Sequence, residues 1–218
     1  MIADEPMSAR ILSHRRVWDG AVFDMDEDVI TVPGDDSQLV RHYVAHPGAV
    51  AVVALRESDT PSGLEVALVD QYRHPVQAKL WEIPAGLLDM EGESPLAAAQ
   101  RELWEEADLV AEQWDVLVDY FTSPGGSTEG LRIYLARQVA KAPAQERFAR
   151  AGEEATMTLK WVDLEAAVAA IHAGRMHNPS AVVGILAAAS ARAQNWEPLR
   201  PAQAPWMRSP WTRAPRDN

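Results

Sequence analysis

The chain contains no cysteine in its 218 residues. This absence excludes a disulfide framework and thiolate chemistry, and it favours a reducing compartment. The sequence also lacks a run of about 18 apolar residues that could span a membrane, and its first residues lack the apolar segment of a secretion signal. We therefore expect a cytoplasmic protein with no membrane partner.

Basic side chains are fewer than acidic ones: the sequence has 20 Lys and Arg and 32 Asp and Glu, which gives a net charge of −12. A field of this sign repels nucleic acid and anionic membranes, so we expect no nucleic-acid partner. A small substrate that carries phosphate would have to be bound by local arginines and a metal ion.

Several catalytic patterns are missing as well. The sequence has no G-x4-G-K-[ST] phosphate loop and no G-x-S-x-G serine nucleophile. His42 and His46 are four positions apart, but in a strand-like stretch that spacing does not bring two imidazoles onto one zinc ion.

What is present is the composition of an ordinary globular protein, with 47% hydrophobic and 24% charged residues. Residues 1–47 are predicted to form an N-terminal antiparallel β meander, in which 1–16 show no clear periodicity and 21–23, 29–32 and 38–44 resemble strands. Residues 48–195 form the main domain, and 196–218 are an extended tail rich in Pro and Trp. Because so small a meander buries little surface by itself, we expect it to pack against a partner.

The main domain mixes strands and helices without strict alternation. The apolar run GAVAVVAL at 48–55 predicts a strand covered on both faces, and further strands are predicted at 64–72, 115–121, 131–139 and 158–162. Helices are predicted at 163–173 and 179–193, with Asp163 and Asn178 as N-caps. This pattern indicates an α/β (α+β) fold in which a mixed sheet lies between helices.

The most informative stretch is WEIPAGLLDMEGESPLAAAQRELWEEADL at 81–109. It predicts a short strand, a turn at Pro84 to Gly86, an acidic loop and a helix. Ser94 is a natural N-cap, and Pro95 suits the first helical position because its missing N–H has no partner there anyway.

Glu102 and Glu106 are four residues apart and therefore lie on one side of this helix, with Glu105 beside them and Glu93 just before the helix. Carboxylates that converge in this way repel one another unless a cation lies between them. Hard oxygen ligands suit Mg²⁺ or Mn²⁺, which commonly bind substrate phosphates as well. The alternative is a solvated acidic face on which Arg101 and Glu105 form an i,i+4 ion pair.

The flanking pattern favours the metal. Glu93, seven further residues and then RELWEE resemble the Nudix box, G-x5-E-x7-R-E-U-x-E-E-x-G-U, where U is aliphatic. WEIPAG and the downstream SPGGSTE resemble the ADP-ribose pyrophosphatase branch of that family. Two departures are visible: six residues separate Gly86 from Glu93, and Asp108 occupies the position of the last glycine. Glycine there would serve a left-handed helix end, so Asp108 puts the geometry of that end in question.

The resemblance implies an α/β/α sandwich and a set of site residues. In it, Glu102 and Glu106 are the principal metal ligands, Glu105 and the carbonyl of Ala85 complete the metal site, and Glu93 supports it. Arg101 is expected to orient a box carboxylate through a salt bridge rather than to contact substrate.

Glu129 is the second candidate, on a loop with three glycines and a proline. In the family, the glutamate of this loop is thought to act as general base or to position the attacking water, so Glu129 and Glu105 are the expected catalytic residues. The alternative for Glu129 is an exposed loop carboxylate.

Arg73, Glu82 and Arg41 are the expected substrate-binding residues. Arg73 ends a strand near the metal loop, where it is placed either to bind a phosphate or to form a salt bridge at the sheet edge. Glu82 lies within a strand and needs a partner if it is buried, which a metal ion, Arg73 or a substrate amine would supply. Arg41 matches an arginine that in the family reaches the substrate from the neighbouring subunit, which implies a homodimer.

The resulting hypothesis is Mg²⁺-dependent hydrolysis, with Mn²⁺ possible as the ion, of ADP-ribose to AMP and ribose 5-phosphate. Another nucleoside-diphosphate sugar, such as GDP-mannose or UDP-glucose, is the first alternative substrate. A Nudix module that senses a nucleotide without cleaving it, and a purely structural dimer, are the alternatives from other functional classes.

Overall fold

The computed structural model describes residues 2–32, 34–143 and 157–207. The chain divides into two compact units. The N-terminal unit contains the described parts of Met1–Gly48, Phe121–Gly130 and Pro205–Asn218, and the sheet unit contains those of Ala49–Tyr120 and Leu131–Ala204.

The sheet unit is built on a mixed sheet of eight strands among the described residues, in the order β10-β5-β4-β9-β8-β11, with β6 paired to β5 and β7 paired to β4. Its strands are β4 (Ala49–Glu57), β5 (Leu64–Arg73), β6 (Ala78–Glu82), β7 (Ala85–Leu87), β8 (Leu109–Phe121), β9 (Gly130–Lys141), β10 (Leu159–Asp163) and β11 (Arg200–Pro201). Strands β4 and β9 run parallel, whereas β5 runs antiparallel to β4, β6 and β10. A one-turn 3₁₀ helix, η1 (His74–Val76), follows β5.

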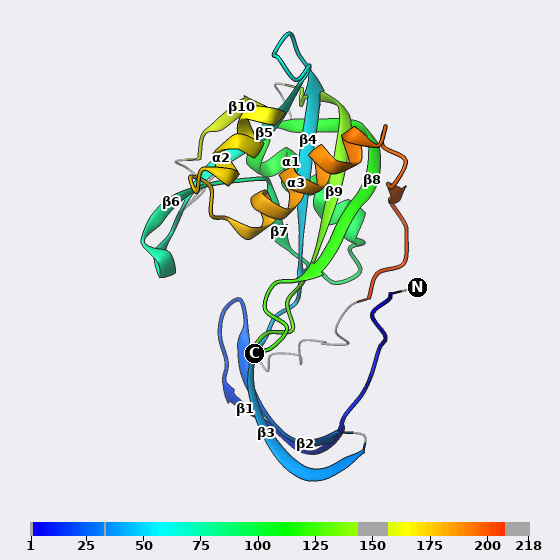
Figure 1. The fold of residues 1–218 in the computed structure, drawn as a ribbon. Helices are drawn as coiled ribbons and strands as arrows, with labels where there is room; N and C mark the ends of the chain where they lie inside the picture. The colour runs from blue at the N-terminus through cyan, green and yellow to red at the C-terminus, as the bar shows by residue number, and fades with distance from the viewer. Residues whose placement is uncertain (1, 33, 144–156, 208–218) are drawn as a thin grey trace. The chain divides into compact units, whose positions relative to one another are not determined.

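Helices cover both faces of this sheet (Figure 1). Helix α1 (Pro95–Ala107) packs on one face, where Leu103 is fully buried beside β4 and β9 residues. Helices α2 (Leu164–His172) and α3 (Pro179–Ala193) pack on the other face, where Ile185 is fully buried. The expected α/β/α sandwich with a mixed sheet is confirmed.

Each helix begins with the cap that its sequence predicts. The side chains of Ser94, Asp163 and Asn178 accept hydrogen bonds from the backbone N–H three residues ahead, at 2.9–3.1 Å. Two backbone N–H groups donate to Asp163, from Ala166 and Ser62, and they hold the pKa of its carboxyl well below the usual range. The three α-helices of the described residues therefore begin at the positions that their N-cap residues predict.

The N-terminal unit contains a separate antiparallel sheet of three strands, β1 (Arg10–Trp18), β2 (Asp24–Val32) and β3 (Asp35–Ala45). The expectation of an antiparallel meander is confirmed, but its first strand was predicted wrongly. Residues 10–18 are a strand although they show no apolar alternation, and 21–23 are not. The reason is that β1 is fixed by charged and polar side chains opposite β2.

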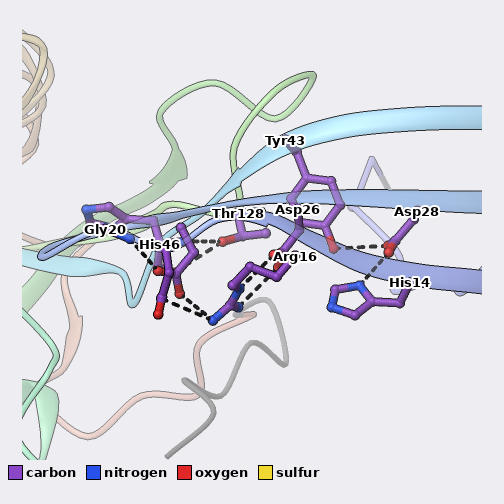
Figure 2. A network of polar contacts seen from close by, with 10 residues as sticks. His14, Arg16, Gly20, Asp26, Asp28, Tyr43, His46 and Thr128 are labelled. Carbon is purple, nitrogen blue, oxygen red and sulfur yellow. Dashed lines mark hydrogen bonds and ion pairs between the residues drawn. The ribbon is translucent and has the colours of Figure 1, made fainter. Parts of the chain in front are cut away.

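Three aspartates on β2 are buried, each at most 8% exposed: Asp24, Asp26 and Asp28. Arg16 of β1 lies 2.7 Å from Asp24 and 2.9 Å from Asp26, and hydrogen bonding to Asp26 raises the pKa of its guanidinium. Figure 2 shows this network together with Tyr43, which donates to Asp28 at 3.0 Å. Buried carboxylates require such partners, so the ion pairs fix the register of the meander.

The described part of the tail is not extended throughout. Residues 196–198 form a turn, and β11 pairs with Asp115 and Val116 of β8. The guanidinium of Arg137 lies 5.3 Å from the ring centroid of Trp196, which explains one tail tryptophan. Residues 208–218 lie outside the described residues.

Among the described residues, no helix combines the length and the apolar character that crossing a membrane requires.

Helix α3 approaches the sheet closely at Gly184, which yields a prediction about stability. A Cβ atom at Gly184 would lie 2.8 Å from Cγ2 of Val53 and 3.1 Å from Cδ1 of Ile83. We expect Gly184→Val to lower the free energy of unfolding by about 1–3 kcal/mol through overpacking, as measured by urea denaturation. The control is Ala193→Val on the exposed end of the same helix. Equal stability of the two variants would contradict the close approach.

Candidate active site

The box carboxylates are carried by α1 and by the loop before it, all within the sheet unit. Glu102 and Glu106 are 8% and 7% exposed, which is unusual for glutamate. They lie next to Leu103 and Ala107, which bury the same helix against the sheet. The packing of α1 therefore forces two carboxylates out of bulk water.

Arg101 binds three of the four glutamates. Its guanidinium donates two parallel hydrogen bonds to Glu93, at 3.0 Å each, and Nη1 lies 2.5 Å from Glu102 and 3.0 Å from Glu105. Hydrogen bonding to Glu93, followed by the charge of Glu102, raises the pKa of Arg101 above its usual value. The Arg101 guanidinium thus contacts the box carboxylates, which is the contact that a residue orienting those carboxylates must make.

Glu106 is held from the sheet side. Its Oε2 accepts a hydrogen bond from the backbone N–H of Ala85 at 2.9 Å. Strand β7, which contains Ala85, is fixed in turn by pairing with Ala51 of β4. The backbone of β7 and the side chains of α1 therefore meet at this point.

Gly86 allows that close meeting. A Cβ atom at this position would overlap the carboxylate carbon of Glu102. Only a residue without a side chain lets the strand approach the glutamate so closely. The glycine that opens the box thus has a steric role here.

Asp108 occupies the left-handed helix end with φ of 53°. Its backbone N–H reaches the carbonyls of Leu103 and Trp104, so it closes α1 as a C-cap. The missing glycine of the box therefore does not change the geometry of the helix end.

The carboxylates fit a hard divalent cation in kind, since Glu102, Glu105 and Glu106 offer oxygen ligands from adjacent turns of one helix. In the described residues, no group of three or more His, Cys, Asp and Glu side chains has the spacing to hold a metal ion. Instead, Glu102 and Glu105 bind the Arg101 guanidinium, and Glu106 accepts a hydrogen bond from the Ala85 N–H. Binding a cation would require them to exchange these partners for the ion.

Arg73 and Glu82 form a bidentate ion pair in the sheet unit. Nε and Nη2 of Arg73 donate to the two oxygens of Glu82 at 2.9 and 2.8 Å. Glu82 is 3% exposed, whereas the Arg73 side chain is 42% exposed. The arginine therefore supplies the partner that the buried carboxylate needs, and it keeps an accessible face.

Glu129 and Arg41 belong to the N-terminal unit. Glu129 accepts a hydrogen bond from Oγ1 of Thr122 at 2.6 Å, and its other oxygen lies 3.8 Å from Nε2 of His46. Arg41 is exposed on β3 and lines a cavity of about 400 Å³ with Asp28, Tyr43 and the loop residues 124–128. The structure thus gathers the predicted residues into two groups, one in each unit.

Sequence reasoning missed the partners of Glu129. The sequence pattern suggested only a zinc ligand for His46, together with His42, and it indicated no role for Thr122. The spacing of 83 residues between His46 and Glu129 carries no signal in the chain itself. The Thr-x6-Glu spacing across a glycine-rich loop was the one local hint, since the ends of a tight loop lie close together.

Comparison with known proteins agrees with this geometry. The NUDIX domain family matches residues 45–182. The chain is 38% identical to an ADP-ribose pyrophosphatase from Mycobacterium tuberculosis (strain H37Rv), over 94% of each sequence. It is also 31% identical to a methanol dehydrogenase activator from Bacillus methanolicus, over 81% of this chain and 90% of that protein.

A solved structure described as an ADP compounds hydrolase has the same fold, with a TM-score of 0.66 at 17% identity, covering 88% of this chain and 98% of that one. The family match covers more than half of the chain, and the box carboxylates lie within it. The chain belongs to the Nudix family and is a Nudix hydrolase.

Proposed function

We propose that this chain hydrolyses the pyrophosphate bond of ADP-ribose with Mg²⁺, releasing AMP and ribose 5-phosphate. The observation that carries the proposal is the gathering of Glu93, Glu102 and Glu105 on one guanidinium, with Glu106 held beside β7. Similarity to proteins named ADP-ribose pyrophosphatase, from Mycobacterium tuberculosis and Bacillus subtilis (strain 168), supports the substrate.

Glu102, Glu105 and Glu106 would hold the ion together with the Ala85 carbonyl, and Glu93 would keep Arg101 in place. Mn²⁺ is the alternative ion for the same oxygen ligands. When bound, the ion supplies positive charge that screens the phosphate oxygens and makes a water easier to deprotonate.

Glu129 would accept the proton of the attacking water. The water oxygen bonds to one phosphorus as the bond from that phosphorus to the bridging oxygen breaks, and the leaving phosphate monoester keeps the electron pair. A carboxylate serves as this base only within about 3 Å of the water. Its hydrogen bond to Thr122 fixes the direction in which its other oxygen faces.

Arg73 would bind a phosphate oxygen through its exposed face while Glu82 fixes its orientation. Arg41 would contact the substrate from a neighbouring subunit. A homodimer is supported by large apolar side chains of the N-terminal unit that are 38–59% exposed, namely Ile11, Leu12, Val17, Trp18, Val22, Phe23 and Val40.

The substrate is tested first by turnover with Mg²⁺. ADP-ribose, GDP-mannose, UDP-glucose, NADH, diadenosine polyphosphates and 8-oxo-dGTP are incubated separately, and the nucleotide products are separated by chromatography. We expect AMP from ADP-ribose to form fastest. Faster cleavage of GDP-mannose or UDP-glucose would support the proposed chemistry but show that ADP-ribose is not the preferred substrate. Binding without any product would favour the sensor instead.

The metal ligands are tested by Glu106→Gln. The amide oxygen can still accept the Ala85 hydrogen bond, so the fold should be kept while the ligand charge is lost. We expect kcat to fall by at least about 100-fold and half-maximal activity to require more Mg²⁺. Glu112→Gln, an exposed glutamate on β8, is the matched control. Near-wild-type turnover of Glu106→Gln at saturating Mg²⁺ would refute the assignment.

The contribution of Arg41 from a neighbour is tested by mixing subunits. Arg41→Ala and Glu106→Gln homodimers should each be slow. After subunit exchange, a heterodimer has one site with both native residues, so we expect a mixture to recover about a quarter of wild-type activity. No recovery, or a monomer in light scattering at the assay concentration, would place Arg41 in its own subunit or outside the site.

A further inference from the structure

The loop that carries Glu129 is bonded to the end of strand β3. Val44 N donates to the Gly126 carbonyl and Thr128 N donates to the Val44 carbonyl, each at 2.9 Å. These bonds and the Val44–Ser127 bridge make the loop a short extension of the meander. The end of β3 therefore determines where the loop lies.

His46 directly follows the last residue of β3. Its backbone N–H donates to Oγ1 of Thr128 at 2.8 Å, and the same hydroxyl lies 3.1 Å from the His46 carbonyl. Figure 2 shows His46 beside Thr128 in the N-terminal unit. The main chain of His46 is thus fixed to the loop by a residue next to Glu129.

The imidazole of His46 has a defined tautomer. Gly48 N–H donates to Nδ1 at 3.0 Å, so Nδ1 carries a lone pair and the proton of the neutral ring lies on Nε2. The side chain is only 11% exposed, and burial lowers the pKa of His46 while the charge of Glu129 opposes that shift. The neutral ring therefore presents an Nε2–H donor at neutral pH.

That donor faces Glu129. Nε2 lies 3.8 Å from Oε1, while Oε2 accepts the Thr122 hydroxyl at 2.6 Å. Among the described residues, His46 is the ionisable group recorded beside this carboxylate, and Thr122 is its neutral partner. A separation of 3.8 Å is longer than a hydrogen bond, so the contact in this structure is an electrostatic one.

We propose that His46 is a positioning residue for Glu129: its Nε2–H and the Thr122 hydroxyl hold the two carboxylate oxygens, so that the base reaches the attacking water in one orientation. The inference rests on the proposed function, in which Glu129 accepts the proton of that water. His46 itself contacts no reacting atom. Its effect is on kcat, because the orientation of the base matters in the transition state and not in substrate binding.

Replacing His46 should therefore lower kcat per folded molecule and leave KM nearly unchanged. A side chain that only stabilises the fold would change the amount of active protein and leave kcat per folded molecule where it is. The split between kcat and KM thus separates positioning from structure.

The experiment compares His46→Ala, His46→Gln and Thr122→Val in the full chain with ADP-ribose and Mg²⁺. For His46→Ala we expect kcat to fall about tenfold and KM to stay within about twofold. His46→Gln keeps an amide donor and should retain most of the activity. The matched control is His42→Ala, an exposed histidine on β3 that binds Glu27 and should act like wild type.

A double mutant tests whether His46 acts through Glu129. Glu129→Gln alone should be slow, and adding His46→Ala to it should cause no further fall in kcat. An equal fall in both backgrounds, or wild-type kcat in His46→Ala, would overturn the inference. Should His46→Ala lose its folded circular dichroism, Thr122→Val tests the same carboxylate from its other oxygen, and wild-type kcat in that variant would overturn the inference too. Full activity of Glu129→Gln would instead refute the proposed base.

Discussion

The candidate site depends on the ion pairs of one guanidinium. Arg101 gathers Glu93, Glu102 and Glu105, which would otherwise repel one another at the end of a helix whose apolar face is buried. Removing one partner from such a buried group leaves uncompensated charge, which typically costs about 3–5 kcal/mol. The arginine therefore keeps the carboxylates together without a cation, and in the proposed function Glu102 and Glu105 would exchange their guanidinium contacts for the ion.

This arrangement requires two other features of the chain. The backbone of β7 must lie against α1, which Gly86 permits because any Cβ there would overlap Glu102. The helix must also end without disturbing Glu105 and Glu106, and Asp108 achieves this in the left-handed conformation that the box assigns to glycine. Aspartate is among the residues that tolerate this conformation, so the departure from the box is accommodated locally.

Much of the sheet unit was predictable because its signals are local. Ser94-Pro95, Asp163 and Asn178-Pro179 marked helix starts, and the continuous apolar run at 48–55 marked a strand buried on both faces. Strand β1 was missed because its polar sequence has no alternation, and its order comes from ion pairs with aspartates of β2. Those pairs join residues about ten positions apart across a turn, and the sequence of residues 10–18 alone does not predict them.

The partners of the candidate site were predictable only where the chain itself brings them together. Arg73 and Glu82 lie on neighbouring antiparallel strands joined by a short connection, so their pairing followed from the sequence as one of two alternatives. The Glu129 carboxylate has one partner at the other end of its loop and one in the segment after β3. Thr122 is close in sequence, whereas His46 reaches the loop only through the backbone bonds of Val44 and Thr128. Contacts of that kind depend on tertiary structure, which single-sequence reasoning does not supply.

The charges of the predicted site residues also bear on the proposed reaction. In the sheet unit these residues include two arginines, Arg73 and Arg101, and both already bind carboxylates. They face five glutamates: Glu82, Glu93, Glu102, Glu105 and Glu106. A net negative group of this kind repels the pyrophosphate of a nucleotide sugar, and the overall charge of −12 adds to that repulsion. Substrate binding at these residues, as proposed, would therefore require added positive charge, and the proposed divalent cation would supply it.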